Sequence, residues 1–350
     1  MRASIILPVY NDKKGLARLT TDIERTRLSD YEIIIVDDGS RDEERPAAAG
    51  RARLLRFDVN RGPAAARNAG AAAARGNILF FIDADVRLPQ HTDVLDAMAR
   101  ALEENPDLDC ALSPSGERPA ENSGGPIALN YSVYHAYYIK RLLAGKTSVR
   151  GRLMFFTTRL GAIRRETFRR SGGFYETLTT VMNEDGEFGA RGYHLGHRSI
   201  LDSSWTHAHA YATSFLHMLQ NYWRTAYVQA MIDRKMDTSP DPSIGRAEKL
   251  RRIFALTLLP APFVLLRADA RALAAGAVLI ALFLFSFGEM RPLIKRVVSI
   301  PLRPAFYAVY AGVTPAIFGG YLAGCLKHAL GRSLLRAKPS SLDWFAQVSE

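Results

Sequence analysis

Short apolar runs alternate with stretches of helical character over the first 110 residues. The run Glu32–Val36, Glu-Ile-Ile-Ile-Val, is a continuous β-branched run, which is typical of a parallel strand covered on both faces. This alternation predicts an α/β domain built on a doubly wound, mostly parallel sheet. We expect strands at Ser4–Val9, Glu32–Val36, Arg53–Phe57 and Asn77–Ile82, and helices at Leu16–Arg27, Pro63–Arg75, Thr92–Glu104 and Tyr131–Tyr138.

The composition excludes several classes of protein. Hydrophobic residues make up 48% of the 350 residues, which excludes a wholly disordered chain. The two cysteines, Cys110 and Cys325, lack metal-type spacing, so a disulfide scaffold and a zinc ribbon are excluded and a reducing compartment is indicated. The apolar run Ser4–Tyr10 is too short for a secretory signal, so we expect the first domain to stay in the cytosol.

Charge and hydropathy change together in the last third of the chain. Residues 246–350 hold 14 Lys and Arg against 5 Asp and Glu, so most of the net charge of +11 lies there. Basic clusters beside apolar runs are typical of the cytoplasmic ends of membrane helices, whereas a nucleic-acid binder places them on a soluble face with aromatics between. We therefore expect membrane lipids as partners, and no nucleic acid.

Three apolar segments without a charge follow one another in this region: Ile253–Leu266, Ala272–Gly288 and Ala305–Leu326, of 14, 17 and 22 residues. A membrane-spanning helix needs roughly 17–25 apolar residues, so the second and third segments are predicted to span. The first is predicted to be a short span, a re-entrant piece or an interfacial helix. Buried helices of a soluble domain are the alternative for all three.

Pairs of aspartates end two of the predicted strands. Asp37 and Asp38 follow Ile33–Val36, and Asp83 and Asp85 follow Ile78–Ile82. Ligands bind beyond the carboxyl ends of strands in sheets of this kind. Two aspartates one residue apart suit a hard divalent cation that also holds phosphates. A turn with a helix cap is the alternative explanation for each pair.

Four ordered motifs resemble the family 2 inverting glycosyltransferases of the glycosyltransferase-A fold. The motifs are Ile6–Asn11 (Ile-Leu-Pro-Val-Tyr-Asn), Val36–Ser40 (Val-Asp-Asp-Gly-Ser), Asn60–Gly70 (Asn-Arg-Gly-Pro-Ala-Ala-Ala-Arg-Asn-Ala-Gly) and Phe81–Asp85 (Phe-Ile-Asp-Ala-Asp). Their order and spacing are similar to that family over roughly the first 230 residues. The resemblance implies a nucleotide-diphosphate sugar as donor and Mn²⁺ or Mg²⁺ as cofactor.

The resemblance also assigns roles on the donor side. Pro8 and Tyr10 are expected to line the nucleotide base. Asp38, or the pair of Asp37 and Asp38, is expected to accept a hydrogen bond from the imide N–H of the base. Arg67 is expected near the ribose and the pyrophosphate, with a solvated helix residue as the alternative.

The metal is assigned in the same way. Asp83 and Asp85 are expected to bind the nucleotide and the ion, Asp85 most directly. His207 is a candidate for a third metal ligand or a pyrophosphate contact, together with His209.

The acceptor side is represented by Glu184 and Asp185, about 100 residues further along. The resemblance places Glu184 with the nucleotide-sugar-binding residues and makes Asp185 the general base that deprotonates an acceptor hydroxyl. A carboxylate on the far side of the sugar from a metal-held leaving group permits a single displacement with inversion. Acids in the first turn of a helix, stabilised by the helix dipole, are the alternative.

These expectations combine into a membrane-anchored inverting glycosyltransferase. It is predicted to act on a hydroxyl of a lipid-linked or polysaccharide glycan, as a multi-pass protein of the inner (cytoplasmic) membrane with its catalytic domain in the cytosol. The expected parts are a nucleotide-sugar domain (1–230), an interfacial basic linker (231–252), membrane helices (253–326) and a basic tail (327–350).

Two other functions remain open from the sequence. One is a polyprenyl-phosphate sugar synthase, in which a phosphate accepts the sugar and scarcely needs a base. The other is a non-catalytic membrane scaffold that binds a nucleotide sugar, for which the loss of an acidic site is the expected mark.

Overall fold

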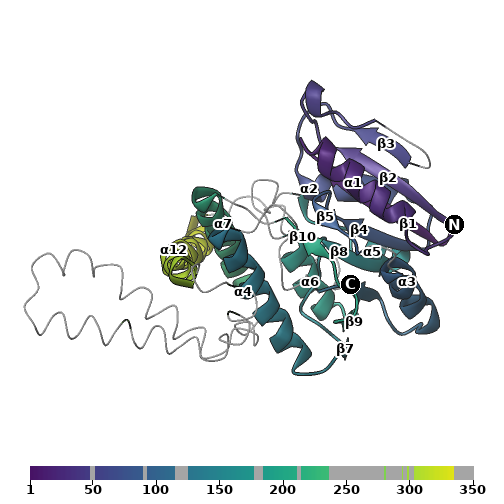
Figure 1. Cartoon of the computed structure of the whole chain (residues 1–350). Coiled ribbons are helices and arrows are strands. Elements are labelled where there is room, and N and C mark those ends of the chain that lie inside the picture. Colours follow the sequence, from purple (N-terminus) through teal and green to yellow (C-terminus); the bar gives the residue numbers. More distant parts are fainter. Residues whose placement is uncertain are drawn as a thin grey trace, which may run out of the picture.

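The computed structural model describes residues 1–47, 52–89, 93–114, 125–176, 184–210, 214–235 and 303–334, with the single residues 280, 294 and 298. Figure 1 shows these residues as a large sheet covered by helices, with a smaller group of long helices beside it. The described residues up to 209 form the sheet and the helices that cover it. Helix α4 is the exception, because it lies with the helical group.

Eight strands form the central sheet, in the order β3-β2-β1-β4-β8-β6-β9-β7. They are β1 (Ala3–Val9), β2 (Tyr31–Asp37), β3 (Ala52–Arg56), β4 (Ile78–Ile82), β6 (Cys110–Leu112), β7 (Ser148–Gly151), β8 (Leu160–Arg164) and β9 (Ser199–Asp202). The short strands β5 (Val86–Arg87) and β10 (Ala208–His209) pair separately. The sheet is mostly parallel, as the sequence predicted.

The half of the sheet made of β3, β2, β1 and β4 is entirely parallel. Ile5 at its centre pairs with Ile33 on one side and with Phe80 on the other. All residues of β1 and β4 are buried, which is why their sequences are continuous apolar runs. The four strands predicted from the sequence are these four, and their ends agree within one residue.

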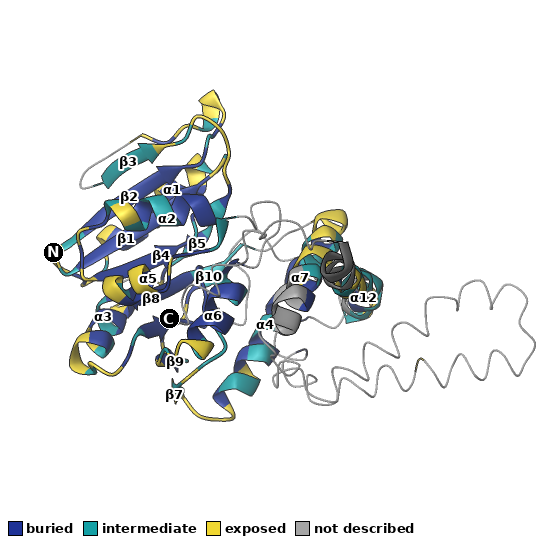
Figure 2. Ribbon diagram, turned by 180° about the vertical axis from the view of Figure 1, so that it is seen from behind, coloured by how far each residue is buried: buried dark blue, intermediate teal, exposed yellow. Residues whose placement is uncertain are grey.

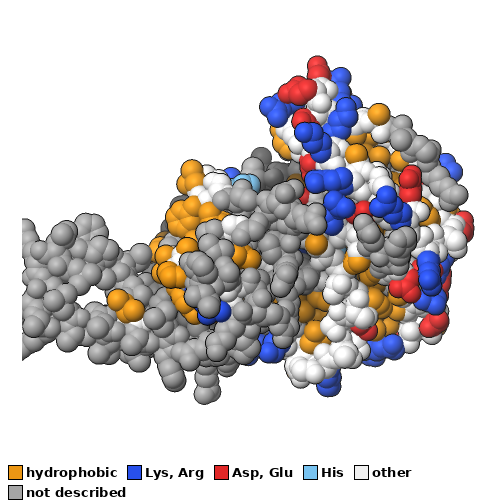
Figure 3. Space-filling view, in the orientation of Figure 1, with side chains coloured by type: hydrophobic (Ala, Val, Ile, Leu, Met, Phe, Trp, Pro, Cys, Tyr) orange, Lys and Arg blue, Asp and Glu red, His pale blue; other side chains and the backbone are white. Residues whose placement is uncertain are grey.

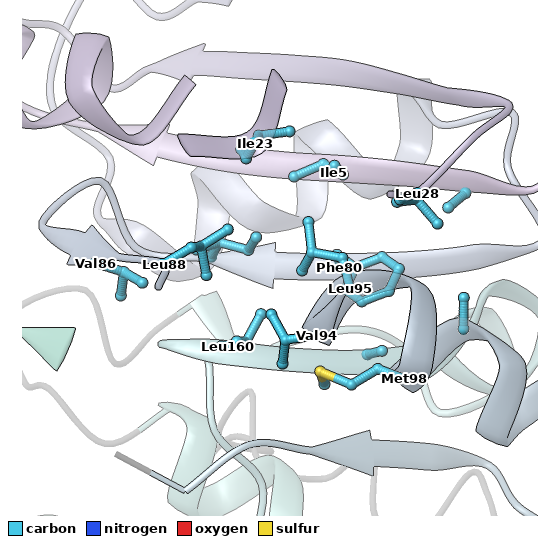
Figure 4. Close-up of a cluster of buried hydrophobic side chains, with 14 of the residues drawn as sticks. Ile5, Ile23, Leu28, Phe80, Val86, Leu88, Val94, Leu95, Met98 and Leu160 are labelled. Atoms are coloured by element: carbon cyan, nitrogen blue, oxygen red, sulfur yellow. The ribbon is translucent and has the colours of Figure 1, made fainter. Parts of the chain in front are cut away.

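Helices cover both faces of the sheet (Figures 1 and 2). The covering helices are α1 (Lys13–Glu24), α2 (Pro63–Ala73), α3 (Val94–Glu104), α5 (Arg165–Arg170) and α6 (Glu184–His194). Side chains alternate along a strand, so Phe80 packs with α1 and α3 while Phe81 packs with α2, α5 and α6. Figure 4 shows the first of these cores, with Ile23 of α1 and Leu95 of α3 near Phe80. The predicted helices in this region are confirmed.

The other half of the sheet is mixed. β8 runs antiparallel to both β4 and β6, β6 is parallel to β9, and β7 closes the edge in the antiparallel sense. These strands have three to five residues each. None of them was among the strands expected from the sequence, because runs this short carry little periodicity.

Within the described part of the chain, three long helices stand beside the sheet: α4 (Pro126–Leu143), α7 (Phe215–Lys235) and α12 (Arg303–Leu334). The expected helix Tyr131–Tyr138 lies inside α4. α12 packs along α7 and also contacts α4. Gly319 and Gly320 face Trp223 of α7 so closely that an added Cβ on either would collide with it. These small residues allow the two helices to approach.

α12 is the one helix among the described residues that is long and apolar enough to cross a membrane, over Arg303–Ala323. It contains the predicted segment Ala305–Leu326 and continues through Pro315. The other two predicted segments, Ile253–Leu266 and Ala272–Gly288, lie outside the described residues except for Ile280.

Hydrophobic side chains are exposed on this helical group. They are Phe215, Leu216 and Trp223 on α7 and Tyr321, Leu322 and Leu326 on α12. Figure 3 shows apolar side chains gathered there, whereas charged side chains of both signs crowd the surface of the sheet domain. A large exposed apolar face marks a surface that contacts another apolar phase or protein.

Candidate active site

The ends of β1 and β2 lie side by side, because Pro8 pairs with Val36 and Val9 with Asp37. Pro8 is buried within the sheet, whereas Tyr10, just beyond it, is 51% exposed. The loops after these strands are joined where the Asn11 amide donates to Ser40 Oγ at 2.9 Å. The structure thus brings Pro8 and Tyr10 next to the Asp37–Ser40 turn, with Tyr10 open to a ligand.

Asp37 and Asp38 have different tasks in this turn. Asp37 is fully buried, accepts from the Ser40 amide at 2.9 Å and forms an ion pair with Arg56. Asp38 accepts from the amides of Arg61 and Gly62, at 2.7 and 2.9 Å, and so holds the loop that leads into α2. Burial raises the pKa of Asp38, although these two hydrogen bonds oppose the shift. The turn that was the alternative explanation of this motif is therefore present.

Gly39 makes this close packing of loops possible. Its φ of 72° lies in the left-handed region that favours glycine, and an added Cβ would lie 2.6 Å from the Asn60 amide nitrogen. The two motifs that were recognised separately in the sequence, Val36–Ser40 and Asn60–Gly70, are thus one structural unit.

Asp83, Asp85 and His209 form a cluster of ligand types suited to a metal ion. One ligand atom from each residue lies within 4.8 Å of the others. The two aspartates follow β4, and His209 reaches them because β10 pairs with β5, with His209 opposite Val86. His209 Nε2 lies 3.2 Å from Asp85 Oδ1. Two carboxylates and an imidazole suit Mn²⁺ or Mg²⁺, so the donor set fits the ion that the sequence implied.

His207, named from the sequence as a candidate for a third metal ligand, is not in this cluster. It is buried, with Nδ1 2.9 Å from the hydroxyl of Ser113. Burial, helped by the charges of His209 and Arg159, holds the pKa of His207 well below its usual range. His209, named with it as a candidate, occupies the position beside the aspartates.

The pKa values of the two aspartates in the cluster are shifted in opposite directions. Burial raises the pKa of Asp83, with Arg67 opposing the shift and the charge of Asp85 adding to it. The pKa of Asp85 is lowered, because the His209 charge and its hydrogen bond outweigh the effect of burial. Two neighbouring carboxylates that disfavour each other's ionisation are the environment in which a bound cation brings the largest relief.

Arg67 lies between two of the acidic sites. Its guanidinium donates to Asp83 at 2.5 Å and forms an ion pair with Glu184, and its side chain is 5% exposed. The sequence predicted a position near the ribose and the pyrophosphate, or a solvated one. The solvated alternative is wrong, and the guanidinium is directed at the two carboxylates. Arg67 therefore fixes the start of α6 against the end of β4.

Asp185 is the second residue of α6 and is half-buried. Burial raises its pKa to about 6, and the neighbouring charge of Glu184 adds to this. One of its carboxylate oxygens accepts from the Gly186 amide at 2.8 Å. A carboxylate that gains its proton near pH 6 is a stronger base than an ordinary aspartate and is still ionised at neutral pH.

α6 is anchored from its other side by a buried ion pair. Arg191 binds Glu187 at 2.7 Å within the helix and donates to the Gly173 carbonyl at 2.8 Å. Gly189 lets the helix approach the backbone of Phe156, whose nitrogen would lie 2.6 Å from an added Cβ. α6 is thus held by Arg67 at its first turn and by the contacts of Gly189 and Arg191 further along the helix.

Two residues of the site belong to none of the motifs recognised in the sequence. Arg159 immediately precedes β8, and its guanidinium contacts the ring of His135 on α4, with nitrogens 2.8 and 3.3 Å apart. The positive charge of Arg159 adds to the lowering of the Asp85 pKa and opposes the rise of the Asp185 pKa. The sequence could have pointed to Arg159 only through β8, the strand that follows it and pairs with β4. That strand was not predicted.

Comparison with known proteins shows which family the chain belongs to. Residues 4–202, more than half of the chain, match the family described as Glycosyl transferase family 2. The chain belongs to this family. The match spans every strand of the central sheet, so the glycosyltransferase-A fold expected from the sequence is confirmed.

Curated relatives align over shorter stretches. A putative glycosyltransferase EpsH of Bacillus subtilis is 33% identical over 155 residues, which cover 42% of this chain and 44% of that protein. An undecaprenyl-phosphate 4-deoxy-4-formamido-L-arabinose transferase of Pseudomonas fluorescens is 38% identical over 96 residues, 25% of this chain and 28% of that one. The chain spans less than half the length of either relative.

Among solved structures, the mannosyltransferase PcManGT from Pyrobaculum calidifontis, in complex with GDP-Man and Mn²⁺, superposes with a TM-score of 0.54. The superposition covers 96% of this chain and 88% of that one at 17% identity. A likeness at this identity shows the common fold.

Proposed function

We propose that this chain transfers a sugar from a nucleotide-diphosphate sugar to an acceptor, with inversion and with a divalent metal ion. The observation that carries the proposal is the bridge made by Arg67. One guanidinium binds Asp83, of the metal-type cluster, and Glu184, the neighbour of Asp185. Arg67 therefore ties the proposed leaving-group site to the helix that carries the proposed base, and a single displacement requires these two to flank the sugar from opposite sides.

Asp83, Asp85 and His209 would hold the metal. A bound Mn²⁺ or Mg²⁺ neutralises the negative charge that develops on the departing diphosphate. Arg67 keeps Asp83 in place from behind, because its guanidinium is buried against that carboxylate. PcManGT, which shares the fold, contains GDP-Man and Mn²⁺, and this supports a donor of the same chemical class.

The nucleotide end of the donor would lie over the ends of β1 and β2. Tyr10 offers an exposed ring for stacking, two residues beyond Pro8, which is buried in the sheet. Asp38 already accepts two amide hydrogen bonds, so we assign it to holding the Asn60–Gly62 loop in shape as well as to the base.

Asp185 would remove the proton from the attacking acceptor hydroxyl. Its raised pKa and partial exposure suit a base that must meet a substrate near neutral pH. Attack from the side opposite the departing diphosphate inverts the anomeric carbon.

A second acceptor class has support of its own. The relative from Pseudomonas fluorescens is named as an undecaprenyl-phosphate transferase, and it aligns with this chain over 96 residues. A phosphate acceptor is already ionised, so it scarcely needs Asp185 as a base. The loss of activity on removing Asp185 separates the two classes.

The helical group is proposed to attach the protein to the cytoplasmic membrane. α12 is long and apolar enough to span, and the exposed apolar residues of α7 lie beside it. The sheet domain, with its charged surface, would then face the cytosol. This position would bring a lipid-linked glycan or a polyprenyl phosphate to the site.

The test is turnover by the full-length protein in detergent. Nucleotide-diphosphate release from a panel of UDP-, GDP- and dTDP-sugars is measured with Mn²⁺, with a lipid extract as acceptor. One donor should support release that disappears on adding a chelator. Release from none of the donors, by protein that binds nucleotide, would favour a non-catalytic binding protein.

A further inference from the structure

Helix α1 carries a carboxylate on the side that faces the core. Asp22 is buried on this helix together with Gly15, Leu16, Leu19 and Ile23, at the spacing of one helical face. A buried carboxylate is unfavourable unless it is paired and hydrogen-bonded. The groups that Asp22 binds therefore indicate why a charge stands on an apolar face.

The partners of Asp22 belong to the strand that follows the aspartates of the metal-type cluster. Asp22 Oδ2 accepts from Arg87 Nε at 2.9 Å and from the Leu88 amide at 3.3 Å. Arg87 is the last residue of β5, and Leu88 comes next. Val86 and Leu88 are buried with Ile23 in the core that α1 covers (Figure 4). α1 thus holds β5 by an ion pair, an amide hydrogen bond and apolar packing.

β5 in turn supports the metal-type cluster. The Val86 amide donates to the Asp83 carbonyl at 3.0 Å and closes the turn that carries Asp83 and Asp85. β5 also pairs with β10, with His209 opposite Val86. These two strands form a sheet of their own, and a two-stranded ribbon is at best marginally stable by itself. The position of His209 against the aspartates therefore depends on what holds β5.

Glu32 provides a comparison within the same domain. It accepts from the Arg75 amide at 2.7 Å and forms an ion pair with Arg53. The Glu32 side chain is 7% exposed and that of Arg53 is 40% exposed, against 6% for Asp22 and 39% for Arg87. Glu32 lies near the start of β2, whereas the site lies at the strand ends. The two ion pairs are thus alike in burial and charge and differ in what they hold.

We propose that Asp22 is a positioning residue for the metal site. It holds β5, and through the pairing of β5 with β10 it keeps His209 within reach of Asp83 and Asp85. Groups that orient the ligands of a metal ion affect its affinity although they do not touch it. The inference rests on the metal ion of the proposed function and adds a residue of α1 on which its binding depends.

The experiment measures Mn²⁺ binding by the full-length protein in detergent. Mn²⁺ alone is the probe, and the electron paramagnetic resonance signal of the free ion gives its affinity. Asp22→Asn and Arg87→Gln test the anchor, and Glu32→Gln is the matched control. Asp85→Asn tests the metal site itself. His209→Gln and the double variant Asp22→Asn/His209→Gln test whether Asp22 acts through the histidine.

Asp22→Asn should weaken Mn²⁺ binding about five- to tenfold, below the roughly 10–100-fold that loss of a group bonded to a ligand can cost. Arg87→Gln should have a smaller effect, because the Asp22 carboxylate still accepts from the Leu88 amide. Glu32→Gln should stay within about twofold of the wild type, since distant sites act independently. In the His209→Gln background, Asp22→Asn should cause no further loss, because the residue that it positions is missing.

Thermal unfolding separates positioning from stability. Asp22→Asn and Glu32→Gln should both lower Tm, because each breaks a buried ion pair, so a loss of stability alone cannot explain a difference in Mn²⁺ affinity. If Asp22→Asn does not fold, Arg87→Gln and its double variant with His209→Gln carry the test.

Three outcomes would overturn the role of Asp22 and leave the metal site in place. They are an unchanged Mn²⁺ affinity of Asp22→Asn, an equal loss in Glu32→Gln, and fully additive losses in the double variant. A wild type that binds no Mn²⁺, or an Asp85→Asn variant that binds it equally well, has a different meaning. Either result would contradict the metal ion of the proposed function, and the inference about Asp22 with it.

Discussion

The two halves of the central sheet differ in how they build the site. In the parallel half, β3-β2-β1-β4, the acidic residues of the site are the last residue of a buried strand or come within three residues after one. In the mixed half, β8-β6-β9-β7, the strands are short, and Arg159 and Asp185 come from separate segments brought together by strand pairing and helix packing. His209 reaches the aspartates at the end of the parallel half from a separate two-stranded sheet, in which β10 pairs with β5. The comparison suggests a division of labour, with the donor and metal on the parallel half and the acceptor on the mixed half.

The largest effect is expected from the metal-type cluster that ends the parallel half. Asp85→Asn, or removal of divalent ions with EDTA, should reduce sugar transfer by about 10³-fold or more, because the developing diphosphate charge loses its counter-ion. Steady-state transfer and calorimetric binding of Mn²⁺ are the measurements. Full activity of the variant in EDTA would break the assignment of this half to the metal.

Removal of the proposed base on the mixed half should have the next largest effect. Asp185→Asn should lower transfer to a hydroxyl acceptor by about 10²–10⁴-fold while leaving nucleotide affinity within twofold. Glu166→Gln, on the exposed surface of α5, is a control that should leave both unchanged. If donor affinity falls and saturated turnover does not, Asp185 belongs with the donor, and the division between the halves fails.

The pH profile sharpens the same assignment. Because the pKa of Asp185 is raised to about 6, the base is protonated and inactive below that pH. The rate should therefore rise about tenfold per pH unit below pH 6 and level off above it, measured with saturating Mn²⁺. The residual rate of Asp185→Asn should lack this step. A step that survives the substitution would point to another titrating group.

The smallest effect is one of stability. A carboxyl group whose pKa is higher in the folded protein than in the unfolded chain stabilises the fold while protonated, and this contribution is lost as the pH rises through about 6. At pH 7.5 the Asp185 carboxylate therefore destabilises the fold, and Asp185→Asn should raise Tm by about 2–5 °C.

At pH 4, the difference in Tm between wild type and Asp185→Asn should largely disappear. Differential scanning calorimetry at the two pH values measures it. Asp37→Asn should act in the opposite direction and lower Tm, because its carboxylate is fully buried and ion-paired with Arg56. Equal changes in Tm for the two substitutions would show that the carboxylates of the two halves do not differ in their effect on stability.

Several site residues could be predicted because their signal is local. Asp83 and Asp85 were found since a buried apolar strand precedes them, and the end of such a strand is where ligands bind. The pair Glu184 and Asp185 was found through the family resemblance, and the structure places both at the start of α6. Local patterns could not tell whether His207 or His209 joins the aspartates, because this depends on how β10 pairs with β5.

Arg67 and Arg159 show what local patterns leave open. Arg67 was picked out by its motif, but its contact with Glu184 joins residues 117 positions apart. Arg159 was not picked out, since β8 is five residues long and pairs with a strand almost 80 positions earlier. In both cases the role of the arginine depends on which groups its guanidinium contacts, and local patterns do not show these groups.

The sequence by itself determined the parallel half of the sheet, the strand-end carboxylates and the apolar character of α12. These features depend on near neighbours along the chain, where hydrophobic periodicity and strand ends act directly. The tertiary structure alone decided which histidine joins Asp83 and Asp85, which carboxylates Arg67 binds and where Arg159 lies. The physical reason is that the charge, burial and pKa of a side chain depend on groups distant in sequence, which only the completed packing brings within a few ångströms.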